Sequence, residues 1–177
     1  MKHWILLLVI ALPLAAIAQQ EPPLTLVTFY SAGKSSKLPF GGGPGVQPWW
    51  GHLWVDDHKI TFKRFGGGHF LTMKLSEGDH SLAGETNSGH EGSDKTVISI
   101  HKGIHYFIRL TSKSSGAPFA PIHSFAEQVT CQEAYREAVA LEPVKLKRIQ
   151  KSWLDYVVRE SYFPECESEP TKSATRN

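Results

Sequence analysis

The chain has 177 residues and a nearly balanced charge, with 19 Lys and Arg side chains against 17 Asp and Glu, or +2 at pH 7. This balance excludes a dedicated nucleic-acid binder, which carries a strong basic excess. Hydrophobic residues make up 41% of the chain, which is enough to form the core of one domain of this length.

The first 18 residues have the pattern of a secretory signal peptide. Met1-Lys2-His3 is a short positive start, residues 4–12 are uniformly apolar, and Ala16-Ile17-Ala18 is a small-x-small cleavage site. The apolar run is shorter than the ~20 residues of a membrane-spanning helix, and Gln19 is not a lipid-accepting cysteine. The alternative is a buried N-terminal helix. We predict cleavage after Ala18 and export to the periplasm or the medium, with no stable membrane insertion afterwards.

Short runs of β-branched and aromatic residues separated by turn residues predict strands along most of the chain. The first run is Leu24 to Tyr30, and a glycine-rich loop follows over residues 31–50. Later runs recur at regular intervals, as in a β-sandwich or barrel. They cover residues 52–56, 59–64, 69–75, 80–86 and 119–129, and in the third of these Leu71, Met73 and Leu75 share one face.

Residues 96–110 predict a β-hairpin. A three-residue turn, His101-Lys102-Gly103 with the glycine in the left-handed region, gathers the apolar residues of both runs on one face, whereas a two-residue turn mixes the faces. We therefore expect His105 and Arg109 on the outer face beside Ser99. The expected core face holds Ile98, Ile100, Ile104, Tyr106, Ile108 and Leu110.

The pattern becomes helical after residue 129. Thr130 is placed to cap a helix over residues 131–141, with Glu133 at the capping-box spacing. Pro143 interrupts this helix, and a second one is predicted over residues 144–160 because apolar side chains recur there on one stripe. That stripe consists of Leu146, Ile149, Trp153, Tyr156 and Val157.

Cys131 and Cys166 are the only cysteines. An isolated pair in an oxidising compartment usually forms a disulfide, which contributes about 3–4 kcal/mol by restricting the unfolded chain. Free thiols or a catalytic cysteine are the alternatives. We expect a mainly β fold, a single antiparallel β-sandwich of the Ig-like or prealbumin-like kind. It occupies residues 19–142 with the first helix. A helical appendage over 143–166 is tied back by the disulfide, and a disordered tail covers 167–177.

Three segments carry recognisable turn and strand motifs: WVDDHKI, GGGHFLTMKLSEGDHSL and TVISIHKGIHYFIRL. They resemble the bacterial exported-domain family DUF2846, with its V-D-G-K, G-x-Y-F, L-x-P-G-x-H and A-G-K-x-Y-Y-I-R motifs. Asp57 stands here for a glycine, His69 stands for a tyrosine, and the third motif lacks its proline. The resemblance covers residues 24–141, implies a small β-sandwich, and carries no established activity.

Histidines suggest an alternative function in metal binding. A zinc site needs three or four ligands at about 2 Å, and the chain has no H-x-H, H-E-x-x-H or C-x-x-C motif. The candidate ligands of a metal-binding accessory protein are a subset of His69, His80, His101 and His105.

Catalytic motifs are missing from the sequence. There is no G-x-S-x-G elbow, and the adjacent Asp56 and Asp57 would point to opposite faces of a strand. Gly33-Lys34-Ser35 lacks the leading glycine of a phosphate-binding loop, since position 28 holds Thr. We predict no enzymatic activity and no cofactor. A hydrolase with an unrecognised site is a third alternative.

Trp49, Trp50 and Trp54 are the best binding feature in the sequence. Aromatic residues at a loop end can stack on sugars or anchor a protein partner, although they can equally plug the open end of a sandwich. Two interpretations are likewise open for the basic face of residues 144–160: it contacts anionic lipid, or it faces solvent. We predict a non-enzymatic envelope or secreted binding module that recognises an unknown protein or an envelope glycan through the three tryptophans.

Overall fold

The computed structural model describes residues 24–31, 45–48, 52–61, 65, 67–84, 95–114 and 122–166. Several predicted features lie outside these residues. They are the signal peptide with its cleavage site at Ala18, the tryptophans Trp49 and Trp50, and the tail over residues 167–177.

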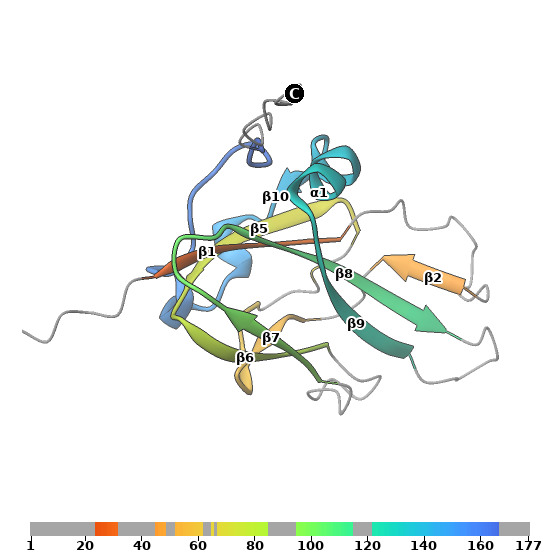
Figure 1. The fold of residues 1–177 in the computed structure, drawn as a ribbon. Coiled ribbons are helices and arrows are strands. Elements are labelled where there is room, and N and C mark those ends of the chain that lie inside the picture. The colour runs from red at the N-terminus through yellow and green to blue at the C-terminus, as the bar shows by residue number, and fades with distance from the viewer. Residues whose placement is uncertain are drawn as a thin grey trace, which may run out of the picture.

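Two sheets make up the fold (Figure 1). The six-stranded sheet has the order β10-β5-β1-β8-β2, with β9 also paired to β8. Its strands are β1 (Thr25–Ser31), β2 (Gly45–Pro48), β5 (His69–Leu75), β8 (Tyr106–Ser114), β9 (Ile122–Val129) and β10 (Glu142–Pro143). The four-stranded sheet has the order β4-β3-β6-β7. Its strands are β3 (Trp54–Val55), β4 (His58–Lys59), β6 (Gly78–Ala83) and β7 (Thr96–Ile100).

The main core lies between the two sheets and is built by alternation along the strands. In β5, Leu71, Met73 and Leu75 are buried in this core, as their spacing predicts. Full burial of one such side chain is worth about 1.5–3 kcal/mol. Other core residues include Val27, Phe29, Ile108 and Leu110 from the six-stranded sheet, and Val55, Leu82, Ile98 and Ile100 from the four-stranded sheet. The prediction of a mainly β fold is confirmed.

The six-stranded sheet is mixed, so the prediction of a purely antiparallel fold is wrong. β1 pairs with β5 antiparallel but with β8 parallel, and β10 pairs with β5 parallel. The chain passes through the other sheet, in β6 and β7, before it returns as β8 beside β1. A strand that returns after such an excursion is free to run in the same direction as its neighbour.

Residues 96–110 do not form the predicted hairpin. β7 pairs with β6 in the four-stranded sheet, whereas β8 pairs with β1 and β9 in the six-stranded sheet. The chain crosses between the sheets at residues 101–105, and Gly103 has a φ of +81°, the predicted left-handed conformation. Two strands that face each other across a core bury the same alternate residues as two paired strands would. The alternation of apolar residues therefore predicted which face of each strand is buried, but not which strands pair with each other.

The consequences for individual side chains in this segment differ. The core residues expected in β7 and β8 are buried, but Ile104 lies in the crossing and is 52% exposed. His105 and Arg109 lie on the outer face of the six-stranded sheet, while Ser99 belongs to the other sheet. Ser99 is therefore not beside them.

The first predicted helix is confirmed as α1 (Cys131–Ala138). Thr130 is its N-cap, and its Oγ1 accepts a hydrogen bond from the Glu133 amide at 3.2 Å. Cys131 and Cys166 lie at disulfide distance, with their sulfurs 2.10 Å and their Cα atoms 5.6 Å apart.

The second predicted helix, over residues 144–160, is wrong. Residues 142–166 form an extended segment, which we call the strap, and it contains two short 3₁₀ turns, η1 (Leu146–Arg148) and η2 (Lys151–Trp153). The Val144 amide donates to the Phe70 carbonyl at 2.8 Å, and the Val158 amide donates to the Thr72 carbonyl at 2.9 Å. In the strap, hydrogen bonds to the otherwise open edge of β5 take the place of the hydrogen bonds that the predicted helix would form.

The strap also joins the two sheets. The Gln150 amide donates to the Ile60 carbonyl at 2.9 Å, and Ile149 forms an isolated bridge with Thr61 beside the four-stranded sheet. In Figure 1 the strap runs in blue beside β5 and then rises toward α1. It therefore closes the side of the molecule between β5 and β4.

A second, smaller core lies on the outer face of the six-stranded sheet, beneath α1 and the end of the strap. Phe163 is 2% exposed, and its ring centroid lies 5.7 Å from that of Tyr30, 5.4 Å from Phe70 and 5.8 Å from Phe107. Ala134 and Ala138 of α1 complete this cluster. No helix among the described residues has the length and apolar character that crossing a membrane requires.

Candidate functional site

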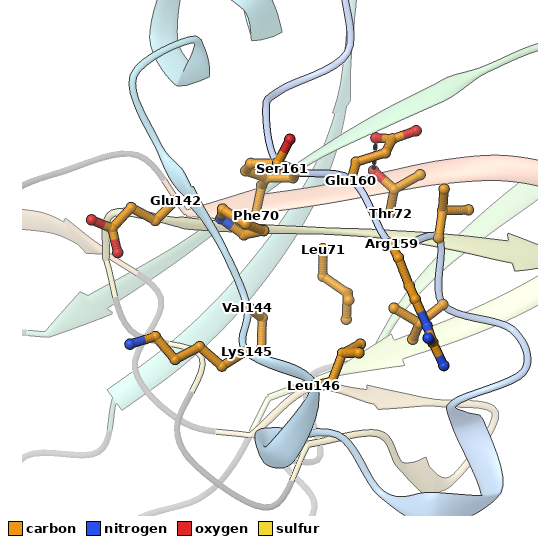
Figure 2. Close-up of a pocket in the computed structure, with 13 residues that line it drawn as sticks. Phe70, Leu71, Thr72, Glu142, Val144, Lys145, Leu146, Arg159, Glu160 and Ser161 are labelled. Carbon is orange, nitrogen blue, oxygen red and sulfur yellow. Dashed lines mark hydrogen bonds between the residues drawn. The ribbon is translucent and has the colours of Figure 1, made fainter.

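The strap forms the walls of two cavities. The first, which we call the strap groove, has a volume of about 430 Å³ and lies on the edge of β5 (Figure 2). Its floor is residues 70–72, and its walls are residues 142–146 and 157–161. Leu71, Val144 and Leu146 supply apolar surface near the middle of Figure 2, and Lys145 extends outward from one wall.

A buried polar chain ends in this groove. Thr72 Oγ1 donates to Glu160 Oε2 at 3.3 Å, Thr28 Oγ1 lies 2.8 Å from Thr72 Oγ1, and His105 Nε2 lies 2.8 Å from Thr28 Oγ1. Each hydroxyl has one proton to donate. Since Thr72 donates to Glu160, it accepts from Thr28, and Thr28 accepts from His105 Nε2. The groove's best-placed polar groups are therefore satisfied by one another.

His105 is held in this chain in its neutral form. Its ring stacks on Phe107 with centroids 4.5 Å apart, and burial lowers its pKa below the ordinary 6.5. A buried neutral ring that donates to a hydroxyl has a structural role in packing β8 against β1.

The second cavity, which we call the aromatic cleft, has a volume of about 490 Å³. It lies where the β3–β4 turn, the end of β5, β6 and the strap meet. Its lining consists of Leu24, Asp56, His58, Lys74, Leu75, Ser76, His80, Ser152, Trp153 and Tyr156.

Three rings line one side of the aromatic cleft. The Trp153 and Tyr156 centroids are 5.5 Å apart at an interplanar angle of 58°, and those of His58 and Trp153 are 6.4 Å apart at 67°. Trp153 is half-buried against the main core, whereas Tyr156 is 42% exposed. The 3₁₀ turn at residues 151–153 and the turn after it bring the two strap rings together.

Asp56 places a carboxylate in the lining of the same cleft. It occupies the β3–β4 turn with a φ of +50°, which Asp tolerates better than most residues. Its Oδ1 accepts from the Ser81 amide at 2.9 Å, and its Oδ2 lies 2.6 Å from His80 Nδ1. His80 Nε2 lies 2.9 Å from the Ser76 carbonyl, which can only accept. His80 Nε2 therefore donates to the Ser76 carbonyl, and its Nδ1 forms a short hydrogen bond with Asp56 Oδ2.

The histidines predicted as metal ligands are not brought together. His80 is bonded within the aromatic cleft, His105 lies in the polar chain, the His69 Nδ1 lies 3.3 Å from the Gly67 carbonyl, and His101 is exposed. Among the described residues, no group of three or more His, Cys, Asp or Glu side chains is placed to hold a metal ion.

Trp54, the described member of the predicted tryptophan site, lines neither the strap groove nor the aromatic cleft. It lies on β3 between Leu53 and Val55, which both face the main core, so its own ring is turned to the outer side. Lys59 Nζ lies 5.7 Å from the ring centroid. This is a cation–π contact within one sheet and does not form a binding surface with the strap.

Arg109 holds a separate cluster of charges beside α1. Its guanidinium donates to Glu127 at 2.8 Å, Glu133 at 3.0 Å and Glu137 at 2.7 Å. The Tyr30 hydroxyl donates to Glu137 at 2.7 Å, and burial, followed by this hydrogen bond, raises the pKa of Tyr30 above its ordinary value. Hydrogen bonding to Glu127 raises the pKa of Arg109, against the opposing effect of burial. The cluster fastens α1 to the six-stranded sheet.

Comparisons of the chain with protein-family models, curated proteins and solved structures give no match. The resemblance to DUF2846 therefore stays a prediction that rests on turn and strand motifs.

The sequence pattern missed the aromatic cleft because Trp153 and Tyr156 fit a helical stripe. Their spacing of three residues also places them side by side in a tight turn, which is how they occur here. Lys147 and Lys151, four residues apart, were a sign against the helix, since like charges at that spacing repel.

Proposed function

We propose that this chain is an exported, non-enzymatic binding module that recognises its ligand in the aromatic cleft. The observation that carries this proposal is the grouping of Trp153, Tyr156 and His58 beside the fixed Asp56 carboxylate in a cavity of about 490 Å³. Ligand sites typically combine apolar and aromatic walls with a few convergent polar groups. The strap groove, in contrast, is lined by one aromatic side chain, Phe70, and its Thr72 and Glu160 bond to each other.

The geometry of the His80–Asp56 pair supports binding rather than proton transfer by His80. Both nitrogens of His80 are engaged, one by Asp56 and one by the Ser76 carbonyl. A general base needs an accessible nitrogen within reach of the reacting proton. His80 instead holds the Asp56 carboxylate in place as a hydrogen-bond acceptor, which suits the recognition of a ligand.

Export and fold class are parts of the same proposal. The signal-like residues 1–18 and the Cys131–Cys166 pair both fit an oxidising compartment. We further place the two-sheet arrangement among the Ig-like or prealbumin-like sandwiches, since an apolar core separates two sheets of short strands.

Retention of envelope material on the immobilised mature chain, residues 19–177, tests the proposal. Tyr156→Ala removes the most exposed ring, and Trp153→Leu removes the second ring while keeping apolar bulk against the core. Tyr162→Ala is the matched control, since Tyr162 is also exposed, at 67%, and lies outside the aromatic cleft. We expect each ring variant to lower retention about tenfold, the effect of one aromatic anchor, and the control to match the wild type. Equal retention by all four proteins, including none at all, overturns the proposal.

A further inference from the structure

We infer that the ligand of the aromatic cleft is a saccharide, one sugar ring of which packs against Tyr156 and Trp153 while its hydroxyls donate to Asp56. This inference rests on the proposed function and names the ligand class for that site. It follows from the arrangement of the rings, from the hydrogen-bonding capacity left on Asp56, and from the charge of the aromatic cleft.

The rings form a contiguous aromatic patch whose planes are tilted. The Trp153 centroid lies 5.5 Å from that of Tyr156 and 6.4 Å from that of His58, at interplanar angles of 58° and 67°, so the three rings pack against one another. Tyr156 is the more exposed of the two strap rings in the cleft, at 42%. Its face suits the C–H face of a sugar ring, and the tilted Trp153 ring then contacts the edge of the same sugar.

Asp56 retains acceptor capacity on the side of the ligand. An ionised carboxylate has about four lone-pair positions, and the Ser81 amide and His80 occupy one on each oxygen. The side chain is 42% exposed. The two protein donors hold the carboxylate in place, and the free lone pairs suit donors such as adjacent hydroxyls.

The remaining polar groups match a ligand that both donates and accepts. Lys74 offers an ammonium group, and Ser76 and Ser152 offer hydroxyls from two edges of the aromatic cleft. A lipid chain would cover Asp56 and Lys74 without satisfying either, at a cost in desolvation. A polyanion would meet one lysine beside one carboxylate, which is a poor complement. An uncharged or weakly charged saccharide fits both groups.

Chemical treatment of the envelope extract tests the ligand class without a guess about the particular sugar. Periodate cleaves vicinal diols and so destroys most sugar rings, whereas proteinase K digests proteins. We expect periodate to lower retention on the wild-type chain at least tenfold relative to a mock-treated extract, and proteinase K to leave it within twofold. Retention that survives periodate and disappears with proteinase K overturns the saccharide inference.

Two variants of one turn then test the role of Asp56 with the deproteinised extract as probe. Asp56→Asn removes the charged acceptor, while Asp57→Asn changes the neighbouring residue, which lies outside the aromatic cleft and pairs with Lys95. Both positions have positive φ, of +50° and +64°, which Asn adopts readily. We expect Asp56→Asn to weaken binding about tenfold and Asp57→Asn less than twofold; equal effects overturn the assignment of Asp56.

The two proposals fail in different ways. If retention depends on Tyr156 but resists periodate, the binding module stands and the saccharide is wrong. If periodate abolishes retention but the Tyr156 and Trp153 variants retain as much as the wild type, a saccharide is bound elsewhere and both proposals for the aromatic cleft are wrong.

Discussion

His105 couples the stability of the fold to pH. Burial lowers its pKa below the ordinary 6.5, so the unfolded chain binds this proton more readily than the folded chain does. The contribution of the neutral ring is therefore complete above about pH 6.5. It decreases as the pH falls below that value and through the lower pKa of the folded state.

The prediction is that the urea midpoint of the wild-type chain is lower at pH 5 than at pH 7.5, and that His105→Gln reduces this difference. Gln places an amide N–H near the position of Nε2, so the hydrogen bond to Thr28 is preserved without a titrating group. His101→Gln, in the same crossing segment but exposed, should retain the full difference. An unchanged pH difference in His105→Gln would contradict the assignment.

Individual side chains were predictable where one strand determined their direction. Alternation placed His105 and Arg109 on the outer face correctly, and the capping-box spacing identified Thr130. Neither pattern predicted that Arg109 forms ion pairs with three glutamates, because Glu127, Glu133 and Glu137 lie on β9 and α1. Partners on other elements depend on tertiary packing, which spacing along one strand does not contain.

The strap depends on few backbone hydrogen bonds, so the covalent tie at its end has a large effect. Cys131 and Cys166 are 35 residues apart in sequence and enclose the strap together with α1. Closing a loop of that length stabilises the folded state by about 3–4 kcal/mol through the entropy of the unfolded chain.

The prediction is that Cys131→Ser with Cys166→Ser lowers the free energy of unfolding by about 3–4 kcal/mol and weakens ligand retention in the aromatic cleft at concentrations where the variant is still folded. Urea unfolding and retention measured side by side check both parts. Thr130→Ser, which preserves the helix cap beside Cys131, is the control. A loss below about 1 kcal/mol would show that the noncovalent contacts of the strap hold it in place without the disulfide.

At the level of elements, the pattern located several strands but not their partners. Residues 69–75 are a strand with the expected buried face, whereas β2 lies within the predicted loop over residues 31–50. Residues 96–110 were assigned the wrong pairing and residues 144–160 the wrong element, since an apolar residue gains as much by facing another sheet as by joining a hairpin or a helix stripe. Residues 144–160 are extended because they bond to the open edge of β5, and that edge exists only once the sheet has formed.

Within the part of the chain that the structure describes, the apolar residues form two clusters, and the strap enters both. Val144, Ile149 and Val157 belong to the main core, while Phe163 belongs to the cluster beneath α1. One covalent segment packed into both clusters makes separate unfolding of either unfavourable.

The prediction is a single cooperative unfolding transition for the oxidised chain. Far-UV circular dichroism follows the sheets and α1. Tryptophan fluorescence reports on all the tryptophans of the chain, among them Trp54 on the four-stranded sheet and Trp153 on the strap. The two urea curves should coincide. A circular dichroism transition at lower urea than the fluorescence transition would show instead that the α1 cluster unfolds on its own.

The strap also sets the time at which the aromatic cleft comes into existence. Trp153 and Tyr156 are synthesised after strands β1 to β10, so every strand of both sheets is made before the two strap rings of the cleft. Docking of the strap is then secured by a bond that only an oxidising compartment supplies. On the proposed export route, a newly made chain therefore gains the bond that secures the strap, and with it the full stability of the proposed ligand site, only after it has left the cytoplasm.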